Sequence, residues 1–284
     1  MPELLLATYL PFNRVHEVAK YFNRSVEAVD PDETLVFVDN VVDGWQMDVL
    51  RDKVEHRTVG GKWGGRVLTW ISILEEFLGR DCVMLVVDSD NVMDAGSGKF
   101  VRGFGDKLLT FMDWDDWKNG SKGILPRSSA VGEVTIGGVA RPLYEYPVYN
   151  GSLFQSGPSF FVGPKQAVLL AAKPDIQIFY KLKNILTSLP RDLVRHLTDE
   201  TFLGVLAYLM GFKKVAWTVG STHYRSSSSE DMDPTQLTLM RAVNALAHER
   251  FAAALYREFG LEEFRRYREK YVLARIKNAF SGAL

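Results

Sequence analysis

Short hydrophobic runs alternate with amphipathic stretches over the first third of the chain. The runs that predict strands are Leu4–Tyr9, Thr34–Val38, His56–Val59 and Asp81–Val87. The stretches that predict helices are Arg14–Val29, Gly44–Val54 and Arg66–Leu78. Asp81–Val87 is an almost continuous hydrophobic run, which is typical of a strand covered on both faces. The alternation therefore predicts an α/β fold, with a doubly wound mixed sheet flanked by helices.

The rest of the chain has a less regular pattern. Between Gly96 and Pro147 the sequence is rich in Gly, Trp and Asp, and we expect loops with some antiparallel strands such as Val134–Val139. The elements expected after this region are a strand over Ser159–Val162, a helix starting within Pro164–Ala172, a helix over Asp199–Met210, a strand over Lys214–Val219, and helices over Arg241–Phe280 interrupted near Gly260. Four consecutive serines within Arg225–Asp233 predict a mobile loop. We therefore expect one domain over residues 1–224, with this loop and C-terminal helices packed on it over residues 225–284.

Composition narrows the class of protein. The 284 residues are 46% hydrophobic and 24% charged, which is ordinary for a globular protein with a sizeable core. The formal net charge of -1 argues against nucleic-acid binding, which requires a basic surface. Cys82 is the only cysteine, which excludes an intramolecular disulfide and fits a reducing compartment. The N-terminus lacks the basic segment of a signal peptide, and no hydrophobic run reaches the roughly 18 residues of a membrane span, so we expect a cytoplasmic protein.

Two aspartates follow the strongest predicted strand, in Asp88-Ser89-Asp90. In an extended chain, residues i and i+2 point the same way, so both carboxylates can face one cation. Ligands of open α/β sheets bind at the carboxyl ends of strands. Carboxylate oxygens suit Mg²⁺ or Mn²⁺, and such an ion also binds substrate phosphates. Asp88 and Asp90 are therefore candidate metal ligands, and the alternative is an Asx-type turn that ends the strand.

The segment Val86–Asn91 resembles the DxD motif of GT-A glycosyltransferases, and the order of the segments around it is also similar to that family. The resemblance implies a GT-A-like fold in which a nucleotide contacts the ends of the first two strands and a basic segment flanked by glycines. The residues at those positions, together with Ser89 of the motif, are Thr8, Tyr9, Asn13, Asp39, Lys62 and Arg66. The structural alternatives are a loop cap for Asp39 and a solvated side chain for Lys62.

Further along the chain, Tyr149-Asn150-Gly151 and the segment Ser156–Gly163 resemble the wall of the acceptor and donor-sugar site in these enzymes. The resemblance makes Asn150, Gly151 and Gly157 candidate contacts, since glycine lets a ligand approach the backbone closely. The alternative is a strand with turn residues at both ends.

An acidic pair, Asp199 and Glu200, opens the predicted helix Asp199–Met210. Acids in the first turn suit the helix dipole, and Thr198 fits the N-cap position, which explains the pair without any catalytic role. The family resemblance implies instead a catalytic carboxylate beside the donor sugar, and of the two we favour Glu200. Both inverting and retaining members of the family have a similar pair, so the stereochemistry stays open.

A histidine follows the last predicted strand, in Gly220-Ser221-Thr222-His223. Several GT-A families have a metal-binding histidine at this place, and a neutral imidazole suits Mn²⁺. The resemblance therefore implies that His223 is a third metal ligand. The alternative is an exposed histidine in a polar loop.

Two other features have both a structural and a functional explanation. Trp114 and Trp117, which lie among three aspartates, fit either a sugar-binding surface or one turn of a surface helix. The C-terminal helix alternates basic and hydrophobic residues. It fits peripheral contact with an anionic membrane or, as we favour, packing on its own domain.

These features together predict a metal-dependent glycosyltransferase of the hexosyltransferase type, with Mn²⁺ or Mg²⁺ as cofactor. Its donor is a nucleoside-diphosphate sugar, and its acceptor is a hydroxyl group of a glycan, a lipid-linked molecule or a small molecule. A nucleotidyltransferase uses the same metal-carboxylate chemistry, but its first loop is usually glycine-rich, and Thr8–Arg14 contains no glycine. A non-catalytic nucleotide-sugar-binding module is the third alternative.

Overall fold

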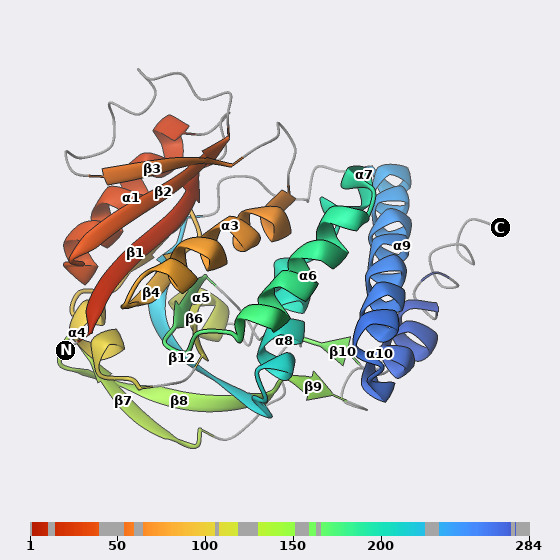
Figure 1. The fold of residues 1–284 in the computed structure, drawn as a ribbon. Coiled ribbons are helices and arrows are strands. Elements are labelled where there is room, and N and C mark those ends of the chain that lie inside the picture. The colour runs from red at the N-terminus through yellow and green to blue at the C-terminus, as the bar shows by residue number, and fades with distance from the viewer. Residues whose placement is uncertain are drawn as a thin grey trace.

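The computed structural model describes residues 2–10, 15–39, 54–59, 65–105, 108–118, 130–150, 159–162, 166–224, 233–273 and 276. Within these residues the main feature is a ten-stranded mixed sheet with helices on both faces (Figure 1). The strand order is β3-β2-β1-β4-β11-β6-β12-β8-β7, and β5 pairs with β12 beside this path. The predicted α/β class, a mixed sheet flanked by helices with a C-terminal helical extension, is therefore confirmed.

The N-terminal half of the sheet is parallel and contains the four strands nearest the N-terminus. They are β1 (Glu3–Leu10), β2 (Glu33–Asp39), β3 (Val54–Val59) and β4 (Cys82–Val87). Helix α1 (Val15–Val29) leads from β1 to β2, and helix α3 (Gly65–Gly79) leads into β4. Because β1 pairs with β2 on one side and with β4 on the other, the winding of the sheet reverses between β1 and β4. Ligands of open α/β sheets bind at such a switch point, beyond the carboxyl ends of the strands.

The other half of the sheet is mixed. Its strands are β5 (Asn91–Met93), β6 (Leu108–Asp113), β7 (Gly132–Ile136), β8 (Val139–Pro147), β11 (Ala167–Leu170) and β12 (Lys214–His223). β11 is antiparallel to both β4 and β6, whereas β12 is parallel to β6. A separate two-stranded ribbon consists of β9 (Tyr149–Asn150) and β10 (Ser159–Phe160).

The remaining helices surround this sheet. They are α4 (Ser97–Arg102), α5 (Trp114–Lys118), α6 (Ile176–Ser188), α7 (Arg191–Val194), α8 (Asp199–Leu209), α9 (Pro234–Phe259), α10 (Glu262–Arg266) and a π-helical segment, Tyr267–Val272. The interruption predicted near Gly260 is confirmed, because Gly260 ends α9 in the left-handed conformation with φ 66°. The predicted helix Gly44–Val54 lies outside the described residues, except that Val54 begins β3.

The prediction of a helix starting within Pro164–Ala172 is wrong, because this segment contains strand β11. All four residues of β11 are buried, since the strand has neighbours on both edges and helices over both faces. A hydrophobic run this short has no period that separates a buried strand from a helix. The expected strand Val134–Val139 is instead the end of a hairpin between β7 and β8. Its turn contains Gly137 and Gly138, with φ values of 59° and 81° that favour glycine.

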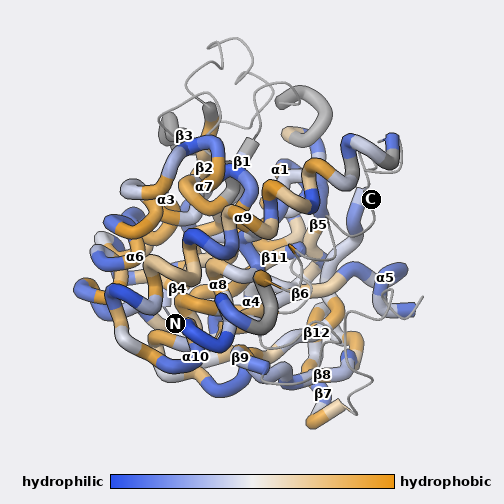
Figure 2. Tube along the Cα trace, turned by 90° about the vertical axis from the view of Figure 1, so that its right-hand side faces the viewer, coloured by the Kyte–Doolittle hydropathy of each residue, from blue (hydrophilic) through white to orange (hydrophobic). Residues whose placement is uncertain are grey.

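Hydrophobic side chains fill both sides of the sheet. On one side, the sheet shares a hydrophobic core with α3, α6 and α8, and α9 packs on α6 and α7. On the other side, the sheet packs against α1 and α4. Helix α6 shows how the sequence specifies this packing, because Phe179, Leu182, Ile185 and Leu186 are buried at helical spacing. Figure 2 shows the matching alternation of hydrophilic and hydrophobic residues along α6.

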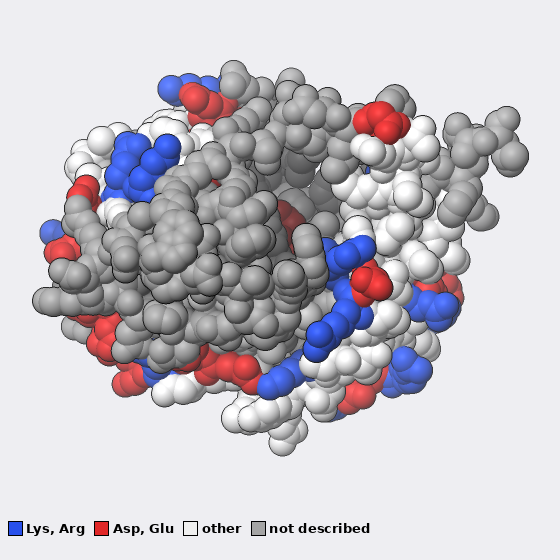
Figure 3. Space-filling view, turned by 90° about the horizontal axis from the view of Figure 1, so that it is seen from above, with Lys and Arg blue, Asp and Glu red and all other residues white. Residues whose placement is uncertain are grey.

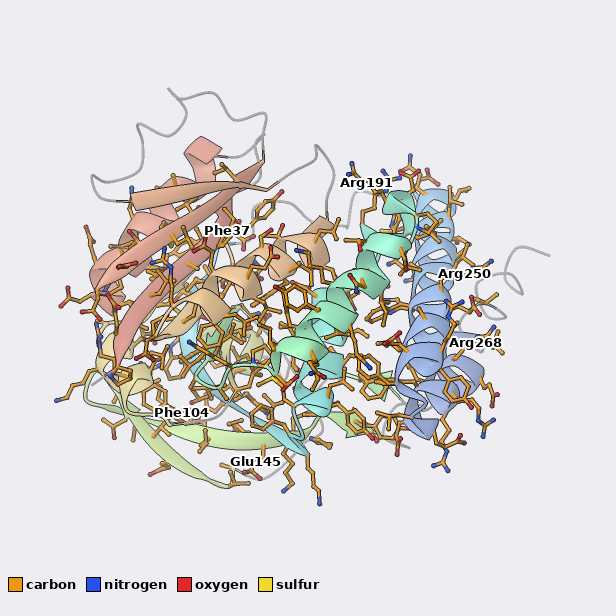
Figure 4. All side chains as sticks on the ribbon, viewed as in Figure 1. Phe37, Phe104, Glu145, Arg191, Arg250 and Arg268 are labelled. Atoms are coloured by element: carbon orange, nitrogen blue, oxygen red, sulfur yellow. The ribbon has the colours of Figure 1, made fainter. Side chains whose placement is uncertain are left out.

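The C-terminal helices pack on the domain through their hydrophobic face. Phe264 and Tyr267 are fully buried in the same core as α6 and α8. The basic residues form ion pairs on the outside, with Arg265 2.8 Å from Glu269 and Arg268 2.7 Å from Glu249. In Figure 4, Arg250 and Arg268 point away from the body of the molecule. Burial of the hydrophobic face agrees with packing on the domain, the alternative that the sequence favoured over membrane contact.

None of the helices in the described residues combines the length and the hydrophobicity that crossing a membrane requires.

Candidate active site

A cavity of about 170 Å³ lies beyond the carboxyl ends of β1 and β4, at the switch point of the sheet. Its walls come from β1, α3, the end of β4 and the start of α8. The lining residues are Tyr9, Thr69, Trp70, Ile73, Val86, Val87, Asp88, Ser89, Asp90 and Asp199. Five of the residues proposed from the sequence, namely Tyr9, Asp88, Ser89, Asp90 and Asp199, are thus brought to one place. Figure 3 looks onto this end of the sheet and shows acidic surface recessed near the centre of the face.

The aspartates of the DxD segment lie in a turn, not in an extended strand. The N–H of Asn91 donates to the carbonyl of Asp88 at 3.0 Å, which closes a turn between β4 and β5. The expectation that Asp88 and Asp90 project alike from an extended chain is therefore wrong. Both side chains nevertheless line the cavity, and both are partly exposed, because the turn wraps around its edge.

His223 contacts this turn directly. Its Nε2 lies 3.3 Å from Oδ2 of Asp90, and the hydrogen bond to Asp90 raises the pKa of the imidazole although burial opposes this. The contact follows from strand pairing, because β12 extends past its predicted end and sets His223 opposite Asn91 of β5. The N–H of Tyr224 then donates to the carbonyl of Asp90 at 2.8 Å. The structure thus brings two of the three proposed metal ligands into contact.

Asp113, the last residue of β6, supports His223, a role that the sequence analysis missed although it counted Asp113 among the three aspartates around Trp114 and Trp117. Its side chain is 3% exposed, and its Oδ2 accepts a hydrogen bond from the backbone N–H of His223 at 2.6 Å. Its Oδ1 accepts from the N–H groups of Asp115 and Asp116 at 2.7 and 2.9 Å, which caps helix α5. An aspartate before a helical turn is a recognisable cap signal, but the contact with His223 arises only from the pairing of β6 with β12.

The two tryptophans of α5 are bonded within the protein. The indole N–H of Trp114 donates to Asp94 at 2.9 Å, and that of Trp117 donates to the hydroxyl of Tyr144 at 3.1 Å. The segment is one short helix, as the structural alternative predicted.

The donor groups near Asp90 fit a divalent cation that a substrate phosphate also coordinates. Among the described residues, there is no group of three or more His, Cys, Asp and Glu side chains that could hold a metal ion. Mg²⁺ and Mn²⁺ are often held by only one or two protein side chains, together with water and substrate phosphates. The Asp90–His223 pair, with Asp88 in the same cavity, offers oxygen and imidazole nitrogen atoms of the kind that Mn²⁺ accepts.

Of the acidic pair at the start of α8, only Asp199 lines the cavity. Asp199 lines the cavity and is 3% exposed, and the indole Nε1 of Trp70 donates a hydrogen bond to its Oδ2 at 3.3 Å. Glu200 is partly exposed and is not among the residues that line the cavity. Thr198 occupies the N-cap position as expected, but its hydroxyl donates to Oγ1 of Thr201 at 2.9 Å instead of capping a backbone group.

Two further candidates lie outside the cavity wall. Thr8 is fully buried, and its hydroxyl donates to the carbonyl of Val87 at 2.7 Å, so it links β1 to β4 at the switch point. Asn150 is buried in the β9–β10 ribbon.

The other candidates are described only in part or not at all. Asp39 ends β2 and Arg66 lies in the first turn of α3, with only their backbones described. Asn13, Lys62, Gly151 and Gly157 lie outside the described residues, as do residues 225–232 of the serine-rich segment.

Comparison with family models gives no match, and comparison of the sequence with curated proteins gives none either. Among solved structures, the chain is similar to TarS 1-349 from S. aureus, with a TM-score of 0.48 and 13% identity over 99% of this chain and 72% of that chain. It is also similar to the mannosyltransferase PcManGT from Pyrobaculum calidifontis, in complex with GDP-Man and Mn²⁺, with a TM-score of 0.47 and 11% identity over 99% and 73% of the two chains.

A third similar structure is described as a glucose-1-phosphate thymidylyltransferase from Bacillus anthracis, with a TM-score of 0.41 and 12% identity over 86% of this chain and 94% of that chain. All three scores are below 0.5, with identities of 11 to 13%. These similarities therefore identify neither a family nor a substrate for this chain, and the function has to be argued from the site.

Proposed function

We propose that this protein is a metal-dependent glycosyltransferase whose donor is a nucleoside-diphosphate sugar. The supporting observation is that Asp90 and Asp199 line one cavity at the switch point of the sheet, and that His223 contacts Asp90. In this proposal Asp90 and His223 bind the metal ion, and Asp199 is a buried carboxylate in the wall of the cavity that Asp90 also lines. A site with both elements can bind a diphosphate and also accept a proton.

In this proposal Asp90, His223 and Asp88 hold Mn²⁺ or Mg²⁺. When bound, the ion neutralises negative charge on the diphosphate as it leaves the sugar. In the proposal Tyr9, at the carboxyl end of β1, contacts the nucleoside, and Ser89, between the two aspartates, also contacts the donor; both residues line the cavity. Asn13, Asp39, Lys62, Arg66, Asn150, Gly151 and Gly157 remain candidate contacts for the rest of the donor and the acceptor.

Asp199 has the catalytic role in this proposal, in place of Glu200, because its carboxylate is the one that faces the cavity. The acceptor oxygen forms a bond to the anomeric carbon while the bond from that carbon to the diphosphate oxygen breaks. The electron pair of the broken bond leaves with the diphosphate, and in an inverting reaction Asp199 takes the proton of the acceptor hydroxyl. In a retaining reaction the same carboxylate stabilises positive charge on the sugar. The anomeric configuration of the product, measured by NMR, distinguishes the two.

The acceptor in the proposal is a hydroxyl of a glycan, a lipid-linked molecule or a small molecule, and the transferred group is a hexose. The test is a panel of UDP-, GDP- and TDP-sugars incubated with the protein and Mn²⁺, followed by measurement of released nucleotide. We expect release from one donor class and its loss with EDTA. Pyrophosphate release from a nucleoside triphosphate and a sugar phosphate, without cleavage of any nucleotide-sugar, would establish the nucleotidyltransferase alternative. Binding of a nucleotide-sugar without turnover would establish the binding module.

A further inference from the structure

Trp70 and Asp199 form a buried polar contact inside the cavity wall. The indole Nε1 of Trp70, on α3, donates to Oδ2 of Asp199, at the start of α8, across 3.3 Å. Trp70 is 4% exposed and Asp199 is 3% exposed, and both side chains line the same cavity. The contact therefore joins the carboxylate at the centre of the proposed chemistry to the neighbouring helix α3.

Packing fixes the two helices independently of this hydrogen bond. α3 and α8 both belong to the hydrophobic core on the same face of the sheet. Gly204 of α8 lies so close to β10 that a Cβ atom there would be 2.5 Å from the backbone nitrogen of Phe161. Because packing already holds α8 in place, the hydrogen bond is not required to bring the helices together, and its main effect is on the direction of the carboxylate.

The indole N–H of Trp70 is a suitable hydrogen-bond donor for a carboxylate that acts in catalysis. An indole N–H can only donate a hydrogen bond, so it stabilises the ionised form of the carboxylate. We propose that Trp70 is a positioning residue that holds the carboxylate of Asp199 toward the reacting atoms. This inference rests on the proposed function, since it gives Trp70 its role through Asp199.

Trp217 shows that a buried indole in this protein can lack such a bond. Trp217 lies in β12, is 3% exposed and stacks on Tyr144 with ring centroids 4.0 Å apart. Within the part of the chain that the structure describes, its Nε1 is buried without a hydrogen-bond partner. Trp217 is not among the residues that line the cavity. Substitution of Trp217 by Phe therefore matches substitution of Trp70 in size and burial, but breaks no hydrogen bond.

The kinetic test compares Trp70→Phe, Trp217→Phe, Asp199→Asn and the double variant Trp70→Phe/Asp199→Asn. Hydrolysis of the nucleotide-sugar that the wild type cleaves with Mn²⁺ is measured over a range of pH. We expect Trp70→Phe to lower kcat by about tenfold with KM nearly unchanged, because a carboxylate that is no longer held in direction is less often aligned with the reacting atoms. The acidic limb of the pH–rate profile of Trp70→Phe should move to higher pH. Trp217→Phe should stay near the wild-type rate, and adding Trp70→Phe to Asp199→Asn should have no further effect.

A second measurement needs no substrate. The indole N–H resonance of Trp70, assigned by its absence in Trp70→Phe, should shift as Asp199 becomes protonated on acidification. This pH response should be absent in Asp199→Asn, whereas the resonance of Trp217 should not change between the two proteins.

The outcomes separate the inference from the proposed function. If Asp199→Asn is inactive but Trp70→Phe keeps its kcat and pH profile, the function stands and the role of Trp70 is refuted. The role of Trp70 is also refuted if the pH response of its resonance is the same in Asp199→Asn as in the wild type. If Asp199→Asn keeps full activity, or no nucleotide-sugar is cleaved by the wild type, the proposed function fails and the role of Trp70 fails with it.

Discussion

The imidazole of His223 lies 3.3 Å from the carboxylate of Asp90, although the two residues lie far apart in the chain. The pairing of β5 with β12 places them together, because His223 faces Asn91, the residue after Asp90. In the proposed site, the pairing of two strands therefore brings the two metal ligands together. Because strand pairing sets this contact, the two residues should act together in binding a cation.

Substitution of His223 tests this joint action. His223→Ala should weaken Mn²⁺-dependent binding of a nucleoside diphosphate by at least about tenfold, since a direct ligand matters no less than the groups that orient ligands. Isothermal titration calorimetry with UDP and GDP, with and without Mn²⁺, measures this. His196→Ala is the matched control, because the imidazole of His196 contacts Asn244 at 3.1 Å and Arg195 at 3.3 Å, whereas that of His223 contacts Asp90. Equal Mn²⁺ dependence in His223→Ala and the wild type would remove His223 from the metal site.

Substitution of Asp113 tests the support behind His223. Asp113→Ala removes the acceptor for three backbone N–H groups, on His223, Asp115 and Asp116. Loss of a helix cap costs roughly 1 kcal/mol and an unsatisfied buried N–H roughly 1–3 kcal/mol, so the free energy of unfolding should fall by about 2–4 kcal/mol. Urea denaturation measures the change. Asp113→Asn, which keeps one carbonyl oxygen, should lose less. A loss below about 1 kcal/mol in Asp113→Ala would show that these contacts are dispensable.

The strands around the switch point were predictable because their hydrophobic runs have clear boundaries. Leu4–Tyr9 and Asp81–Val87 are bounded by Pro, Asn or Asp, and the structure places β1 and β4 there. β6 was hidden by its surroundings, since Leu108–Asp113 is hydrophobic but lies between segments rich in glycine, tryptophan and aspartate. Short strands inserted in the middle of a sheet, such as β11, depend on neighbours that are distant in sequence, and no local pattern reports them.

The chemistry of the site was predictable in part for the same reason. Asp88 and Asp90 follow a recognisable strand, so their place at the end of the sheet could be predicted. Which member of the Asp199–Glu200 pair faces the cavity depends on how α8 rotates against α3, and the first turn of a helix accommodates acids on any side. The contact of Trp70 with Asp199 also arises from this packing, and nothing near Trp70 in the sequence indicates it.

Asp32 provides a pH-dependent contribution to stability at the other end of the sheet. Its carboxylate accepts hydrogen bonds from Arg102 and from the N–H of Leu4, and these hold its pKa below the ordinary value of 3.8. A lowered pKa gives stability that is present above the unfolded-state value and lost as the pH falls through the folded-state value. The difference in unfolding free energy between the wild type and Asp32→Asn should therefore be constant near neutral pH and shrink below about pH 4. Urea denaturation at several pH values tests this, and a difference that persists in acid would contradict it.

Asp199 and Glu200 can be compared directly, because they are neighbours in one helical turn. Asp199→Asn should lower kcat for sugar transfer by about 10²–10⁴-fold, the usual contribution of a general base, and leave donor affinity nearly unchanged. Glu200→Gln should lower kcat far less, since Glu200 is not part of the cavity wall. Steady-state kinetics with donor binding by calorimetry measures both, and thermal unfolding of each variant checks that the fold is intact. A larger loss of kcat in Glu200→Gln would return the catalytic role to the residue that the sequence favoured, and would show that α8 presents a different side to the bound donor.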